Sequence, residues 1–208
     1  MTRRLIAGAV GVVALAGVVA GQGSRVPSPG GTAATEIRGK YVGGGDGAVY
    51  QGGKWIEITY GRPIRRGRDL FGPGGNFGRD LNAGAPVWRA GANVSTRLKT
   101  ELPLVINGKT VAPGEYSLFI ILRPNNWTLI VSSWAAQKDF DPSNTQALWG
   151  SFGYTPDKDV VRAPMRVSQT ASSVDQLTWL FVDVTPAGGA LEITWDKTVA
   201  LVPFKVGT

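Results

Sequence analysis

Apolar and polar residues alternate along several short segments of the chain. In residues 94–102, Val94, Leu98 and Leu102 fall on one face, and the charged residues fall on the other. Residues 54–60 repeat this pattern. Because successive side chains of a strand point to opposite sides, such segments predict strands with one face on a core and the other in water.

Turn signals separate the predicted strands. Asn107–Gly108 stands between residues of high β-propensity, which is the strongest short-range signal for a hairpin. Pro113–Gly114 and residues 186–189 mark further turns, and no helical pattern follows residue 20. The sequence therefore predicts an all-β fold, an antiparallel β-sandwich of about nine strands, with a β-barrel as the alternative.

The alternation also selects the side chains that should face the core. We expect the following residues in or near it: Ile56, Ile58, Leu98, Phe119, Ile121, Leu129, Val131, Leu180, Val182, Ile193 and Trp195. Tryptophans within strand patterns are assigned to the core as well. Trp134 and Trp149 differ, because they flank the irregular residues 135–147, and they are candidates for lining a ligand groove.

The first twenty residues predict export rather than a folded element. Arg3 and Arg4 precede an uncharged apolar run that ends in small residues at Ala20, the arrangement of a secretory signal peptide. A retained membrane anchor is the alternative, although Gly and Ala dilute the run. We expect a periplasmic or secreted protein without a membrane span after cleavage. Residues 21–47 are predicted to be a flexible lead-in, and residues 48–208 a single β-sandwich domain.

Composition excludes several kinds of chemistry. The chain contains neither Cys nor His, which rules out a Ser-His-Asp triad, thiol catalysis and metal sites built on thiolate or imidazole. Asp139, Asp141 and Asn144 begin a calcium-loop pattern, but the glycine and glutamate that complete it are missing. We therefore predict no metal and no cofactor.

The net charge bears on whether the partner is a nucleic acid. The net charge is +7, and removal of Arg3 and Arg4 with the signal peptide lowers it to +5. This moderate charge, together with export, argues against a nucleic acid as the partner.

Arginines gather in the loop after the strand predicted at residues 54–60. Arg62, Arg65, Arg66 and Arg68 lie at the start of this loop, and Arg89 and Asn93 lie at its end. Consecutive antiparallel strands usually lie close together, so both ends of the loop should meet at one end of the sheet. We expect Arg62, Arg89 and Asn93 to converge there on an anionic group, with Arg65, Arg66 and Arg68 steering it. The alternatives are a solvated basic loop and a clamp in which the arginines pair with the protein's own acids.

Six motifs occur in one order along the chain: YGRPIRRGRDLFG, VWRAGAN, INGKTVAPGEYSLF, WTLIVSSW, WGSFGYTPDKDVVR and WDKTVALVPFKV. Together they resemble the bacterial family called domain of unknown function 2911, over about residues 49–206. The resemblance implies an exported all-β domain and no established activity. The chain departs from the family pattern at Val94, where that pattern has Glu, and in longer loops at residues 73–86 and 135–147.

Two functions fit this sequence. The first, which we favour, is a non-catalytic exported domain that binds an anionic small molecule, a glycan or a partner in the cell envelope. The second is a hydrolase or lyase that uses carboxylates to act on glycans. It would draw on Asp69, Asp80, Asp139, Asp141 and Asp157, whose spacing does not pair them.

Overall fold

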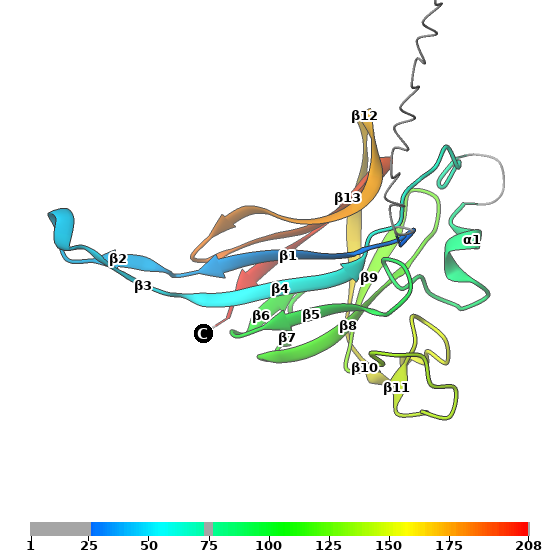
Figure 1. Ribbon diagram of the computed structural model, residues 1–208, viewed down its shortest axis with the longest axis horizontal. Coiled ribbons are helices and arrows are strands. Elements are labelled where there is room, and N and C mark those ends of the chain that lie inside the picture. The colour runs from blue at the N-terminus through cyan, green and yellow to red at the C-terminus, as the bar shows by residue number, and fades with distance from the viewer. Residues whose placement is uncertain (1–25, 73–76, 208) are drawn as a thin grey trace, which may run out of the picture.

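The computed structural model describes residues 26–72 and 77–207 (Figure 1). The main element is one antiparallel sheet of nine strands in the order β1-β4-β5-β8-β9-β12-β13-β6-β7. These strands are β1 (Gly30–Ile37), β4 (Lys54–Gly61), β5 (Thr96–Thr100), β6 (Leu104–Ile106), β7 (Lys109–Val111), β8 (Gly114–Ile121), β9 (Trp127–Ser132), β12 (Asp159–Thr185) and β13 (Gly188–Val206). The sheet is open, with β1 and β7 at its edges. The predicted all-β fold is confirmed, and the barrel alternative is wrong.

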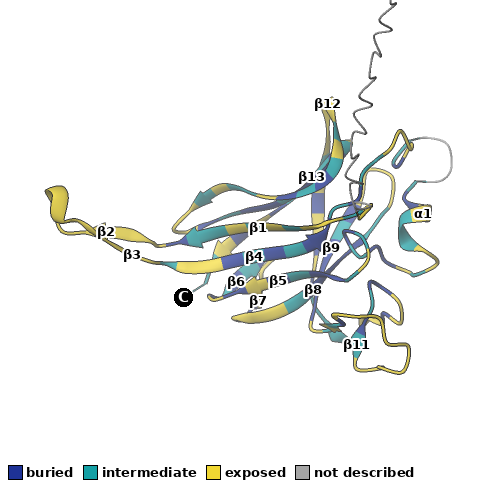
Figure 2. Cartoon of the chain, viewed as in Figure 1, coloured by how far each residue is buried: buried dark blue, intermediate teal, exposed yellow. Residues whose placement is uncertain are grey.

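Shorter elements lie outside this sheet. They are the antiparallel pair β2 (Lys40–Val42) and β3 (Val49–Gln51), the parallel pair β10 (Ala135–Ala136) and β11 (Ala147–Leu148), and the single turns α1 (Arg79–Asn82), η1 (Gly45–Gly47) and η2 (Pro156–Lys158). The β2–β3 hairpin projects from the molecule, and Figure 2 shows that its strands are exposed. Within the described ranges, no helix has the length and apolar character needed to cross a membrane.

The long strand β12 bends the sheet into two layers. Residues 159–165 of β12 pair with β9, whereas residues 166–185 pair with β13. Register shifts beside Val174 mark irregular positions, and such bulges bend and twist a strand. The β12–β13 pair therefore passes over β1 and β4 (Figure 1), and the Tyr60 hydroxyl accepts a hydrogen bond from the Trp179 backbone N–H across 3.1 Å. The result is a β-sandwich.

Aromatic rings fill the middle of the core. Trp88 stacks on Trp195 with centroids 6.2 Å apart, and the Trp127 ring meets Trp88 edge-on at 6.3 Å. The predicted core residues Ile56, Ile58, Leu98, Leu129, Val131, Ile193 and Trp195 are buried in this main cluster, Phe119 lies in a second cluster, and Ile121 and Val182 are half-buried. Most of the residues that the alternation assigned to the core are therefore buried.

The prediction of core residues is wrong at Leu180 of β12. Leu180 was predicted in the core but is 38% exposed, whereas Leu177 and Trp179 are buried. Both faces of this segment are apolar, so periodicity alone does not choose between them. The larger indole takes the core position because its burial removes more apolar surface from water.

The N-terminal segment predicted to be a flexible lead-in contains part of the fold. Residues 30–37 form β1 and pair with β4 along their whole length, so the prediction is wrong for them. Small residues hide the alternation, in which Ala33 is half-buried and Ile37 is fully buried. The predicted signal peptide, residues 1–20, lies outside the described residues.

Candidate functional site

An open cavity of about 460 Å³ lies beside the loop between β4 and β5, at one end of the sandwich. Arg66, Arg68, Arg89 and Asn93 contribute to its wall, together with Asp80. We call this cavity the basic pocket. Four of the predicted site residues thus meet in one place, and they come from both ends of the loop as the strand order suggested.

Residues at the end of this loop are held rigidly against the core. The backbone of Trp88 pairs with Ile120 through two hydrogen bonds of 2.8 Å, and the carbonyl oxygen of Ala90 accepts hydrogen bonds from the Trp179 indole at 3.0 Å and the Thr96 hydroxyl at 3.1 Å. At Gly91, a Cβ would lie 2.7 Å from Thr96 Oγ1, so a larger residue cannot fit without a shift. The segment that carries Arg89 is therefore preorganised.

Arg89 is a half-buried cation beside the cavity. Its Nη1 donates a hydrogen bond of 2.7 Å to the backbone oxygen of Asn93, and burial lowers the pKa of its guanidinium. None of the ion pairs in the described part of the chain involves Arg89. Asn93 lies beside it with φ of 62°, and its side-chain Nδ2 donates to Ser28 O at 3.2 Å. Asn93 thus positions Arg89 and ties the N-terminal segment to the loop.

Arg62 does not join this group, and its predicted convergence with Arg89 and Asn93 is wrong. Its Nε donates to Leu177 O and its Nη2 donates to Thr178 Oγ1, both at 3.4 Å. The side chain turns toward β12 because Pro63 and Ile64 run alongside that strand, where the backbone N–H of Leu177 donates to Pro63 O. Arg62 therefore connects the two layers through a carbonyl oxygen and a hydroxyl group, and not through an acid as the clamp alternative described.

Of the remaining three arginines, Arg65 pairs with an acid of the protein, whereas Arg66 and Arg68 line the basic pocket. Arg65 forms an ion pair with Asp196 at 3.2 Å and donates to Arg68 O at 2.9 Å, outside the pocket wall. Arg68 donates to Arg65 O and Ile64 O, each at 2.9 Å, and its guanidinium lies over the Trp195 ring at 5.6 Å. The Arg66 side chain is exposed and has no hydrogen bond or ion pair with any residue in ranges 26–72 and 77–207.

A second cavity of about 520 Å³ also has Arg89 in its wall. Phe140, Trp149, Phe152 and Tyr154 line it, and we call it the aromatic pocket. Arg89 contributes to the walls of both cavities, so the two pockets are neighbours. Sequence reasoning selected Trp149 but missed the other three rings. The available signal was their spacing around Trp149 in a segment without strand periodicity.

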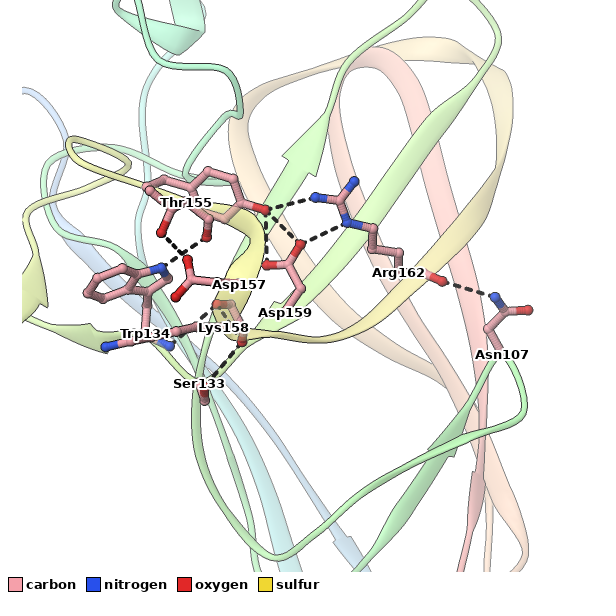
Figure 3. A network of polar contacts seen from close by, with 10 residues as sticks. Asn107, Ser133, Trp134, Thr155, Asp157, Lys158, Asp159 and Arg162 are labelled. Carbon is pink, nitrogen blue, oxygen red and sulfur yellow. Dashed lines mark hydrogen bonds and ion pairs between the residues drawn. The ribbon is translucent and has the colours of Figure 1, made fainter.

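Trp134 was predicted to line a groove, but it contributes to neither pocket. Its indole Nε1 donates to Thr155 O at 3.1 Å, and the Lys158 ammonium lies over its ring, 3.6 Å from the centroid (Figure 3). Contacts within the protein thus occupy both the polar edge and one face of the ring. Trp134 serves to fasten the β9 end to the segment before β12.

A polar network holds Tyr154, which forms part of the wall of the aromatic pocket. Its hydroxyl lies 2.7 Å from Asp159 Oδ2 and 3.2 Å from Arg162 Nη2, and Arg162 Nε donates to Asp159 Oδ2 at 2.8 Å. Figure 3 shows Asp159 and Arg162 reaching toward each other in this network. Burial, followed by the hydrogen bond to Asp159, raises the pKa of Tyr154. The phenol therefore remains neutral and its ring is held in place.

The acids considered for catalysis do not face one another across either cavity. Asp80 is the only carboxylate among the described residues that line the basic pocket, and the described lining of the aromatic pocket has none. Within the described ranges, no group of three or more acidic residues could hold a metal ion. The arrangement offers arginine donors and aromatic surfaces, which suit binding.

Comparison with known proteins identifies the family of this chain but assigns no activity. Neither the curated proteins nor the solved structures provide a match. Residues 47–204, which run from β3 through most of β13, match the family described as "Protein of unknown function (DUF2911)". The chain therefore belongs to this family, as its ordered motifs predicted.

Proposed function

We propose that this protein is an exported, non-catalytic domain that binds the anionic group of a small ligand in the basic pocket. The observation that carries the proposal is Arg89, a half-buried guanidinium without an ion-pair partner in the described part of the chain. A buried charge is costly unless it is paired, and an anionic ligand supplies the missing partner. The arginine fork also matches a carboxylate or phosphate in two parallel hydrogen bonds.

The surrounding residues support a ligand of negative charge. Arg66, Arg68 and Arg89 line the pocket with one acid, Asp80, so positive side chains predominate. Arg68 uses both Nε and Nη2 for hydrogen bonds to the loop backbone, whereas Arg89 uses only Nη1, for Asn93 O. Arg66 and Arg89 are therefore the groups that contact the ligand. Because Arg66 is exposed, its contribution should weaken as the salt concentration rises.

Titration with inorganic phosphate and with acetate tests the proposal. We expect both anions to raise the melting temperature of the mature protein, and Arg66→Ala to weaken their binding by about tenfold, the loss of one charge-assisted hydrogen bond. Arg166→Ala is the matched control, because Arg166 is an exposed arginine of β12 that lines neither pocket. Absence of any anion effect at millimolar concentration, or equal losses in the two variants, would contradict the proposal.

Export is tested separately. N-terminal sequencing of protein recovered from the periplasm or medium should give a chain that starts near Gly21. A chain that starts at Met1 would show that the N-terminal segment is retained.

A further inference from the structure

We propose that the ligand is an acidic carbohydrate whose carboxylate lies at Arg89 and whose sugar ring lies in the aromatic pocket. This inference rests on the proposed function, because it shares Arg89 with the basic pocket. It adds a second subsite and a chemical class. The two cavities meet at Arg89, so one small molecule can place its anionic group and its ring on adjacent surfaces.

Exposed aromatic rings mark the second subsite. Phe152 is 74% exposed and Phe140 is 58% exposed, and the Phe140 ring contacts Trp149 with a centroid distance of 5.9 Å. Large apolar side chains gathered at a cavity leave surface that a ligand can cover. The apolar C–H faces of a sugar ring cover such surface, while its hydroxyl groups remain directed to polar partners.

Two unsatisfied polar atoms in the wall of the same cavity favour a ring with hydroxyl groups. Ser151 is 1% exposed, and its Oγ has no hydrogen-bond partner among the described residues; the same holds for Asn82 Oδ1. Both residues line the aromatic pocket. Both oxygens are buried in the wall of the cavity. A ligand hydroxyl group that reaches them on binding can both donate and accept, whereas a hydrocarbon ligand would leave them unsatisfied, which costs free energy.

The walls of the subsite are braced in advance. Gln137 Nε2, with its two N–H groups, lies 2.9 to 3.1 Å from the backbone oxygens of Asp141, Asn144 and Ala147, which holds the loop that carries Phe140. The buried Ser95 hydroxyl lies 2.6 Å from Gly150 O, which fixes the chain next to Trp149. Preorganised walls reduce the ordering cost of binding.

Calorimetric titration of the mature protein with D-glucuronate, D-glucose and acetate tests the inference. D-glucuronate carries both the ring and the carboxylate, and each of the other probes carries one of them. We expect glucuronate to bind at least about tenfold more tightly than acetate or glucose, because both subsites contribute. In Phe152→Ala, glucuronate affinity should fall about tenfold while acetate affinity is unchanged. Trp55→Ala is the control, because Trp55 is an exposed aromatic residue on β4 that lines neither pocket.

The outcomes separate the two proposals. If acetate and inorganic phosphate bind but glucuronate binds no better than acetate, the sugar subsite is wrong and the anion site stands. Glucuronate binding that is unchanged in Phe152→Ala also overturns the subsite, because the ring must then lie elsewhere. If no anion binds, the proposed function itself fails.

Discussion

Arg89 lies directly over Gly150. A Cβ placed on Gly150 would lie 2.6 Å from Arg89 Nη1. Gly150 also has a φ of +62°, a backbone conformation in which residues other than glycine are strained. This contact joins the loop that carries Arg89 to the segment that carries Trp149. The absence of a side chain at position 150 is therefore part of how the two pockets meet.

Gly150→Ala should displace the Arg89 guanidinium. We expect a loss of about 1–3 kcal/mol of stability and a clear fall in phosphate affinity, because both the backbone and the contact are strained. Gly108→Ala is the matched control, since Gly108 has a φ of +73° but no atom within 4 Å of the place that a Cβ would take. Thermal unfolding and phosphate titration of both variants check this. Equal changes in melting temperature and phosphate affinity in the two variants would show that the contact with Arg89 is unimportant.

Arg62→Ala should affect stability rather than binding. Its hydrogen bonds to Leu177 O and Thr178 Oγ1 connect the layers away from the basic pocket. We expect a loss of about 1 kcal/mol, with a melting temperature about 2–4 °C lower and unchanged phosphate affinity. Arg66→Ala should show the reverse pattern. Loss of phosphate binding in Arg62→Ala at an unchanged melting temperature would contradict this structural role.

Tyr154 should make stability fall at alkaline pH. Its pKa is raised in the folded protein, so the folded state holds the phenol proton more tightly than the unfolded state. This contribution is fully present below the ordinary tyrosine pKa of about 10 and is lost as the pH rises from there toward the folded value. Melting temperatures from pH 8 to 11 should therefore decline less steeply in Tyr154→Phe than in the unaltered protein. Tyr41→Phe, which removes an exposed hydroxyl of β2, should leave the slope unchanged.

Leu177 and Leu180 test the face of β12 that meets the core. Leu177 is buried and Leu180 is 38% exposed, because residues three apart in one strand point to opposite faces. Leu177→Ala should cost about 2–5 kcal/mol because it leaves a cavity, whereas Leu180→Ala should cost less than about 1 kcal/mol. Denaturant unfolding measures both values. A larger loss in Leu180→Ala would show that the core faces the other way.

The strands with strict alternation could be predicted from the sequence. In β4 and β5, Ile56, Ile58 and Leu98 face the core as expected, because only one face of each segment is apolar. The all-β class and the family followed from such segments, from the turns between them and from the ordered motifs. β1 was missed because its glycines and alanines have low β-propensity, and pairing with β4 stabilises it instead.

The sequence predicted only part of the site. Local pattern and strand order determined that the arginine-rich loop leaves and re-enters one end of the sheet, and they placed Arg89 and Asn93 near each other. The directions of the side chains depended on the fold: β12 crosses beside Pro63 and takes up the Arg62 guanidinium, while Arg89 remains at the cavity. Phe140 and Phe152 reach the same cavity as Arg89 only through packing between segments about fifty or more residues apart, a separation that no local periodicity encodes. The sequence by itself thus determined the strictly alternating strands and the chemistry available, and tertiary packing added β1 and decided which of those groups meet.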